Sequence, residues 1–204
     1  MLTMIEEITV VSISLFAIVD PLATIPVFMS FFGGSERKKR RKAATQAVLA
    51  AFLLLAVFAA FGMALLNYLN ISISAFMIAG GLLLLLLAFE FLMGTLPRSR
   101  HVESDTSDAI VPIGTPLLTG PGAITSAIFF THVYGLAVTF TAIVIVMAIS
   151  LAALLGSTRI TGFLGKNGLR VITRIMGLIT AAIAISLIEK AMIAYGLIQA
   201  VPLV

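Results

Sequence analysis

Two long stretches without a charged residue constrain the fold of this chain more than any other feature. Residues 43–89 and 109–158 contain no Asp, Glu, Lys or Arg. Each stretch is long enough for two membrane crossings at about 20 residues per helix. The whole chain of 204 residues is 60% hydrophobic and 11% charged, whereas soluble domains carry roughly 25% charged residues. We therefore predict an all-α integral membrane protein that crosses the bilayer several times.

Polar residues and tight turns divide the apolar sequence into six predicted spans. They cover residues 8–32, 43–66, 73–93, 110–132, 136–155 and 172–198. Three spans are an odd number, so a second copy of a three-span unit has to be inserted upside down relative to the first. We predict a single transmembrane domain over residues 1–204 with this 3+3 inverted repeat. Repeat 1 covers residues 5–95, a cytoplasmic loop covers 96–109, and repeat 2 covers 110–200.

Positive charge is concentrated on alternate loops of this arrangement. Twelve of the 13 Lys and Arg residues lie in or beside the first, third and fifth loops, and only Lys190 lies elsewhere. The twelve are Arg37, Lys38, Lys39, Arg40, Arg41, Lys42, Arg98, Arg100, Arg159, Lys166, Arg170 and Arg174. The positive-inside rule places these loops in the cytoplasm, with both termini outside the cytoplasmic (inner) cell membrane. The basic cluster has no interleaved aromatic residues, so we expect it to attract anionic lipid headgroups and not nucleic acid.

Two short proline breaks interrupt the first and fourth spans at matching places. The sequences are DPLATIP at residues 20–26 and TGPG at residues 119–122. Proline removes a backbone donor and glycine loosens the backbone, so each sequence is predicted to split its helix. Asp20 lies about 18 Å along a helix from residue 8, and Gly120 about 15 Å from residue 110, near the middle of a roughly 30 Å hydrocarbon layer. Paired broken helices form the binding sites of many secondary transporters.

The half-helices at each break offer complementary groups to a small zwitterion. Those that follow the breaks begin near Thr24 and Ala123, and they point unpaired N–H groups toward the gap. Those that precede the breaks offer carbonyl groups, which suit an ammonium group or a coupling cation. Ser and Thr hydroxyls near the breaks could hydrogen-bond the substrate; alternatively, they form hydrogen bonds with neighbouring helices or with their own backbone. The candidate substrate-binding residues are Asp20, Pro21, Ala23, Thr24, Pro26, Thr119, Gly120, Pro121, Gly122, Ala123 and Thr125.

Two carboxyl groups are candidates for binding a coupling proton. Asp20 is predicted to lie at the centre of the bilayer, where an ionisable side chain is costly unless it is paired or hydrated. Such a position indicates a functional residue, although Asp20 alternatively caps the half-helix after Pro21 without a role in transport. Glu90 precedes a predicted helix end at Gly94. It is a second candidate for the proton, or else it reaches toward the headgroups.

Three motifs occur in a fixed order along the chain. They are DPLATIPVF at residues 20–28, PLLTGPGAIT at 116–125, and GKNG at 165–168 followed by RIMGLITA at 174–181. Together they resemble the MarC family of bacterial and archaeal inner-membrane proteins, and the resemblance extends over the whole chain. The sequence departs from the usual family pattern at Ala23, where Gly is usual, and at Thr24, where Asn is common. The resemblance implies proton-coupled movement of glycine, alanine and similar amino acids, as in family members of the SnatA type.

The residues and the resemblance together predict a secondary active transporter of small neutral amino acids such as glycine, alanine and serine, coupled to protons. A passive channel or facilitator is the alternative, because broken helices also line continuous pores; a non-transporting membrane subunit is another. An enzyme is not expected, since neither His is placed to serve a serine nucleophile at mid-depth. Without Cys and with two distant His, we expect no metal or cofactor. The direction of transport and the oligomeric state stay open.

Overall fold

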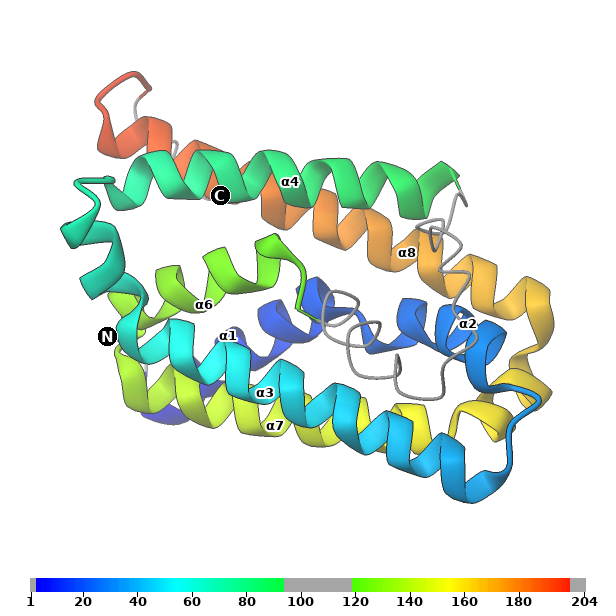
Figure 1. The fold of residues 1–204 in the computed structure, drawn as a ribbon. Helices are drawn as coiled ribbons and strands as arrows, with labels where there is room; N and C mark the ends of the chain where they lie inside the picture. The colour runs from blue at the N-terminus through cyan, green and yellow to red at the C-terminus, as the bar shows by residue number, and fades with distance from the viewer. Residues whose placement is uncertain (1–2, 94–118, 199–204) are drawn as a thin grey trace.

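The computed structural model describes residues 3–93 and 119–198, and every regular element in these ranges is a helix. The elements are α1 (Met4–Val19), α2 (Pro21–Phe32), α3 (Arg37–Tyr68), α4 (Ile73–Met93), α6 (Pro121–Tyr134), α7 (Leu136–Leu155) and α8 (Ser157–Ala194) (Figure 1). Five segments are long and apolar enough to cross a membrane, namely Met4–Pro26, Arg37–Tyr68, Ile73–Met93, Leu136–Leu155 and Arg170–Ala194. The protein is therefore all-helical, with five candidate membrane spans in its described part.

The predicted spans differ from these helices mainly where basic residues begin a helix. Spans 73–93 and 136–155 coincide with α4 and α7. The basic residues 37–42 were expected in a loop, but they form the start of α3, and α8 begins at Ser157 rather than at residue 172. α8 contains a kink at Gly165, with φ of 63°, and it ends at Ala194, before the predicted residue 198. The loop 96–109 and residues 110–118 of the fourth predicted span lie outside the described residues.

The two ends of the helical bundle carry different connections. α1 begins and α8 ends at the same end as the α3–α4 and α6–α7 turns (Figure 1). The α2–α3 connection and the α7–α8 junction lie at the opposite end, together with the basic residues 37–42 and Arg159. Lys190 lies at the end with the α3–α4 turn, where its Nζ is 5.1 Å from the ring centroid of Phe129. The basic residues 37–42 of the first predicted loop therefore share one end of the bundle with Arg159 of the fifth.

The first half of the described chain, α1–α4, and the second half, α6–α8, pack against each other through α1 and α2 on one side and α6 on the other. α1 and α2 pack mainly on α7 and α8 of the second half, and α6 packs on α3 and α4 of the first half. The second helices of the halves, α3 and α7, pack on each other, as do the third helices, α4 and α8. If α1 and α2 are matched with α6, α3 with α7 and α4 with α8, the contacts of one half correspond closely to those of the other. Each half therefore depends on the other to bury its first helix.

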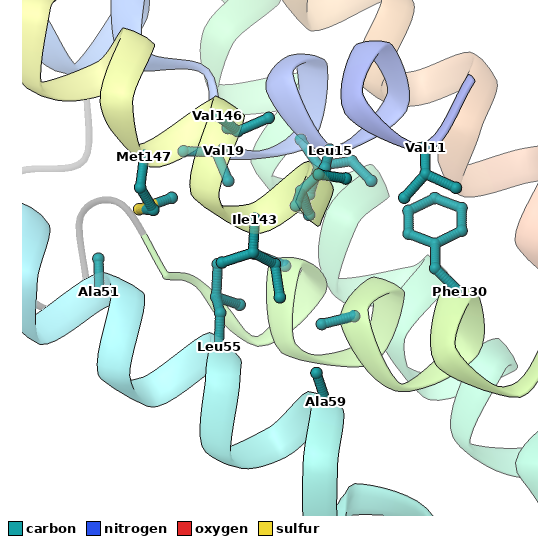
Figure 2. Packing of buried hydrophobic residues seen from close by; sticks show 14 of the residues in the cluster. Val11, Leu15, Val19, Ala51, Leu55, Ala59, Phe130, Ile143, Val146 and Met147 are labelled. Atoms are coloured by element: carbon teal, nitrogen blue, oxygen red, sulfur yellow. The ribbon is translucent and has the colours of Figure 1, made fainter. Parts of the chain in front are cut away.

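The centre of the bundle is a tight apolar core with large side chains facing small ones. Leu15 of α1, Leu55 of α3 and Ile143 of α7 are fully buried and lie together (Figure 2). Gly62 lets α3 approach α6, because a Cβ at this position would overlap the side chain of Ile128. Large apolar side chains also cover much of the outer surface, which suits contact with lipid. Examples with more than half of their surface exposed are Leu53, Val57, Phe61, Leu86 and Leu178.

Candidate functional site

The chain leaves the helical path at Asp20, between α1 and α2. Asp20 has φ of 40° and ψ of 67°, the left-handed conformation that Asp and Asn tolerate best among non-glycine residues. Its N–H ends α1 by donating to the carbonyl oxygen of Phe16 at 2.9 Å. Pro21 then occupies the first position of α2, where its fixed φ is favourable and its missing N–H costs little. The sequence Asp-Pro thus builds a break inside the first candidate span.

Asp20 also caps the N-terminus of α2. Its Oδ1 accepts a hydrogen bond from the N–H of Ala23 at 3.0 Å, and its carbonyl oxygen accepts one from the N–H of Thr24 at 3.2 Å. The hydroxyl of Thr24 donates to the same carbonyl at 3.1 Å. The expectation that these N–H groups are unpaired is therefore wrong, because the side chain and backbone of Asp20 occupy them. The expected capping of α2 by Asp20 is confirmed, and capping leaves open a role of the same residue in transport.

One oxygen of the Asp20 carboxyl is left over after capping. Asp20 is only 1% exposed. Its Oδ2 is buried and has no hydrogen-bond partner in the part of the chain that the structure describes. A buried polar atom without a partner costs roughly 1–3 kcal/mol in proteins, and more when it carries charge. The arrangement therefore favours a proton or a cationic group of a ligand at Oδ2.

Thr180 of α8 supplies a donor that Pro21 lacks. In a continuous helix, the N–H of residue 21 would donate to the carbonyl of Ala17, and proline has no N–H. The hydroxyl of Thr180 instead donates to this carbonyl oxygen at 3.1 Å, and Thr180 is fully buried. In the sequence, Thr180 belongs to the RIMGLITA motif, but no local pattern predicts this hydrogen bond. The signal for Thr180 itself was the occurrence of a polar residue inside the apolar part of α8.

The second predicted break coincides with the start of α6, whose N-terminus differs from that of α2. α6 begins at Pro121, and Gly120 at the N-cap position has no side chain with which to cap it. The carbonyl of Gly120 accepts from the N–H of Ala123 at 2.9 Å and from that of Ile124 at 3.3 Å. A Cβ at Gly120 would meet no described atom within 4 Å. Of the two helices that begin at the predicted breaks, α6 is therefore the one without an acidic cap, so its positive end is better suited to a carboxylate.

Close contacts fix the position of α6 against α4. Thr125 of α6 lies against Gly80 of α4, where a Cβ would overlap its side chain. One turn earlier, Gly122 lies against the side chain of Leu84 in the same way. Leu84 is about 16 Å along α4 from Ile73, which is close to the middle of this helix. The start of α6 therefore lies at mid-depth in the bundle.

Two further contacts bring the first break to the same depth. α4 and α8 run antiparallel (Figure 1), and a Cβ at Gly81 would lie 2.9 Å from the carbonyl oxygen of Ala184. Because the helices are antiparallel, Leu84, one turn after Gly81, lies at the level of Thr180, one turn before Ala184. The Thr180 hydroxyl donates a hydrogen bond to the carbonyl of Ala17 in α1, just before the break. Val11 of α1 also points toward Phe130 of α6 (Figure 2). From that contact, Asp20 and Gly120 lie about 14 and 15 Å along their helices in the same direction.

The other predicted residues fall into groups according to their surroundings. Thr119, Ala123 and Thr125 are buried, and the two threonines have interaction partners. Ser126, fully buried next to Thr125, has a hydroxyl without a partner among the described residues. Glu90 is exposed and lies about 9 Å further along α4 than Leu84, so the structure does not bring it to Asp20. In the described ranges, no group of three or more His, Cys, Asp and Glu is arranged to hold a metal ion.

We expect Thr180→Val to lower the melting temperature of the purified protein by about 1–7 °C, since interhelical hydrogen bonds in membranes contribute about 0.6 to 1.7 kcal/mol. Valine keeps the shape of threonine but leaves the Ala17 carbonyl without its donor. Thr141→Val is the matched control, because the Thr141 hydroxyl donates within its own helix, to Ala137 at 2.8 Å. Equal melting of the two variants would show that the bond across α1 and α8 does not stabilise the break.

Comparison with known proteins identifies the group to which this chain belongs. Residues 5–195 match the profile described as MarC family integral membrane protein. A UPF0056 membrane protein of Pyrococcus horikoshii is 32% identical, over 92% of this chain and 95% of its own. One of Methanocaldococcus jannaschii is 33% identical over 86% of this chain and 90% of its own, and YvbG of Bacillus subtilis is 30% identical over 87% and 90%. No solved structure matches. The chain belongs to the MarC family of integral membrane proteins.

Proposed function

We propose that this protein is a secondary active transporter that moves small neutral amino acids, such as glycine, alanine and serine, across the cytoplasmic membrane with protons. The observation that carries the proposal is the Asp20 carboxyl, which is 1% exposed at a helix break and has an unpartnered oxygen among the described residues. An ionisable group at this depth is costly in a membrane, and such groups mark transport pathways and proton relays.

The site provides one partner for each charge of an amino acid. Oδ2 of Asp20 accepts a hydrogen bond from the ammonium group of the substrate. When the substrate is absent, it binds the coupling proton. The positive N-terminus of α6, with Gly120, Pro121 and Gly122, receives the substrate carboxylate. In this proposal Thr119, just before α6, and Thr125 and Ser126 of α6 line the approach to the site, and Ala23 of α2 limits the size of the substrate. Because both partners of the substrate are fixed to broken helices, a small movement of either helix changes its access to the two sides.

The proposed transport mechanism rests on a 3+3 inverted repeat in which α2 and α6 follow equivalent breaks. The pattern of packing supports this, since α1 and α2 pack on the second half as α6 packs on the first. In this proposal the end of the bundle with residues 37–42 faces the cytoplasm, as the positive-inside rule requires, and both termini lie outside. Alternating access then arises from movement of one half against the other around the fixed site.

Uptake of labelled glycine into proteoliposomes tests the function. The purified protein is reconstituted, and a proton gradient is imposed or omitted. Accumulation above the external concentration only with the gradient supports coupled transport. Equilibration without accumulation supports a passive facilitator instead, and uptake equal to that of protein-free vesicles, for glycine, alanine and serine alike, contradicts the proposal. Vesicles with the gradient collapsed by a protonophore are the control for leak.

Substrate competition is expected to follow side-chain size. Ala23 is 2% exposed, and its N–H is held by the Asp20 carboxyl, so its methyl group lies beside the proposed ammonium site. Alanine and serine should therefore compete strongly with glycine, and leucine and phenylalanine weakly. Charged amino acids should be excluded, because one buried carboxylate cannot compensate a second charge.

Ala23→Gly is expected to improve competition by the larger neutral amino acids. Ala59→Gly, at an equally buried position in α3, is the control for the loss of a methyl group and for the general cost of glycine in a helix. Competition assays in the same proteoliposomes provide the measurement. If leucine competes as well as alanine, or if both variants change the ranking equally, this picture of the pocket is wrong.

A further inference from the structure

A hollow lined by three arginines lies at the end of the bundle opposite the start of α1. Arg37, Arg40 and Arg41 of α3, together with Leu154 and Leu155 of α7, enclose about 140 Å³. Positions 37, 40 and 41 follow the i, i+3, i+4 spacing, so they lie on one face of α3. Arg40 is half-buried, whereas Arg37 and Arg41 are exposed. Three guanidinium groups therefore share one hollow that has room for a phosphate group.

Within residues 3–93 and 119–198, no side chain forms an ion pair with the three arginines of this hollow. The helix start adds to the charge. α3 has no acidic residue in its first turn, and the exposed Glu36 at its N-cap position makes no side-chain capping hydrogen bond, although carboxylates are favoured at this end of a helix. Like charges held close together in a partly buried hollow repel one another. An anion that enters the hollow removes this repulsion and satisfies several donors at once.

The walls of the hollow indicate which source of anion fits best. Leu154 is 1% exposed and closes the hollow on the inner side, whereas Leu155 is 43% exposed and forms its outer rim. From Leu155 an exposed apolar stripe continues along one face of α7 through Ala148 and Val144. A ligand with a phosphate group and a long apolar part matches this combination. A soluble phosphate compound would leave the stripe unused.

We propose that the hollow binds the phosphate group of an anionic phospholipid, whose acyl chains lie along the outer stripe of α7. The guanidinium groups are suited to this, since their planar forks bind two phosphate oxygens at a time. The bound lipid joins the start of α3 to the end of α7, the second helices of the two halves. It therefore stabilises the packing of one half on the other.

Binding is tested with two double variants of equal charge. Arg40→Gln/Arg41→Gln removes two lining residues, and Lys38→Gln/Lys39→Gln removes two cations of the same helix turn that do not line the hollow. Both have the same net charge, so general attraction to anionic lipid affects them equally. The melting temperature of each protein in detergent is measured during titration with phosphatidylglycerol, with phosphatidylcholine and with inorganic phosphate.

We expect phosphatidylglycerol to raise the melting temperature of the parent and of the lysine variant at similar concentrations, and phosphatidylcholine to have little effect. In the arginine variant the half-saturating concentration should rise about tenfold or more, because two charge-assisted contacts are lost. Equal behaviour of the two variants would overturn the site. Half-saturation by inorganic phosphate at the concentration that phosphatidylglycerol requires would overturn the lipid as its source.

Arg40→Lys/Arg41→Lys is the second test if the glutamine variant does not fold. It keeps the charge but removes the planar forks, so the expected result is again weaker binding of phosphatidylglycerol than in the parent. Unchanged binding would show that charge alone is sufficient and that the hollow is not a shaped site.

Discussion

Asp20→Asn is expected to abolish proton-driven accumulation of glycine and to leave the fold intact. Asparagine tolerates the left-handed conformation at φ of 40°, and its side-chain oxygen can accept the same hydrogen bond from Ala23. The amide is also cheaper to bury than a carboxylate. What it cannot do is bind a proton or pair with an ammonium group as an anion. The variant therefore separates the cap from the charge.

The measurement is glycine accumulation in proteoliposomes, with melting temperature as the check on folding. Glu189→Gln, which removes an exposed carboxylate of α8, is the matched control and should transport normally. Calorimetric binding of glycine to Asp20→Asn assigns the role further. Retained binding without accumulation indicates that Asp20 carries the proton, and loss of both indicates that it holds the ammonium group. Normal accumulation by a folded Asp20→Asn protein would remove Asp20 from the mechanism.

Glu90→Gln tests the second candidate for the coupling proton. Glu90 is exposed and lies about 9 Å along α4 from the level of the breaks, so we expect it to retain most of the accumulation. Loss of accumulation in this variant, with glycine binding intact, would move the proton site from Asp20 to Glu90.

The apolar spans were predictable because hydrocarbon allows few alternatives. The absence of charge between residues 43 and 89 requires helices, and a tight turn then fixes the start of α4. The helix starts of α3 and α8 were missed for a physical reason. Arg and Lys favour helix nearly as much as alanine does, so a helix continues beyond the hydrocarbon through basic residues. Charged residues therefore predict where a span leaves the hydrocarbon layer, but they do not predict where the helix itself begins or ends.

The break at Asp20 was predictable, but the partners of its atoms were not. Proline and aspartate in sequence indicate a helix stop followed by a start, and this pattern is local. Capping by Asp20 follows from the same local geometry and was one of two interpretations. The Thr180 hydroxyl reaches Ala17 across 163 positions of the chain, so only the packing of α8 on α1 reveals it. Long-range hydrogen bonds of this kind leave no periodic signal.

The two glycines of the second predicted break illustrate the same limit of local patterns. In the sequence both loosen the backbone beside Pro121. In the structure only Gly122 is confined, because a Cβ there would overlap the side chain of Leu84, whereas a Cβ at Gly120 meets no described atom within 4 Å. One glycine therefore permits close packing of α6 on α4, and the other leaves space at the N-terminus of the half-helix.

Gly122→Ala is accordingly expected to destabilise the protein, and Gly120→Ala to leave its melting temperature nearly unchanged. Leu84 is 1% exposed, so its side chain is surrounded by other atoms of the protein and cannot turn outward to make room. Overpacking of this kind costs roughly 1–3 kcal/mol, which corresponds to a fall of about 2–12 °C in melting temperature for a chain of this size. α6 moves away from α4 to relieve the overlap, so we also expect glycine uptake to fall, because the start of α6 is part of the proposed site.

A double variant distinguishes overlap with Leu84 from a change in backbone flexibility. Leu84→Ala alone is destabilising, since it leaves a cavity, but it also removes the atoms that the methyl group introduced by Gly122→Ala would meet. The combined variant should therefore be more stable than the sum of the two single destabilisations predicts. The difference in the free energy of unfolding is expected to be roughly 0.5–3 kcal/mol. If flexibility at residue 122 were the cause instead, Leu84→Ala would add its full cost and restore nothing. Additive melting would then assign to Gly122 the backbone role that the sequence alone suggests.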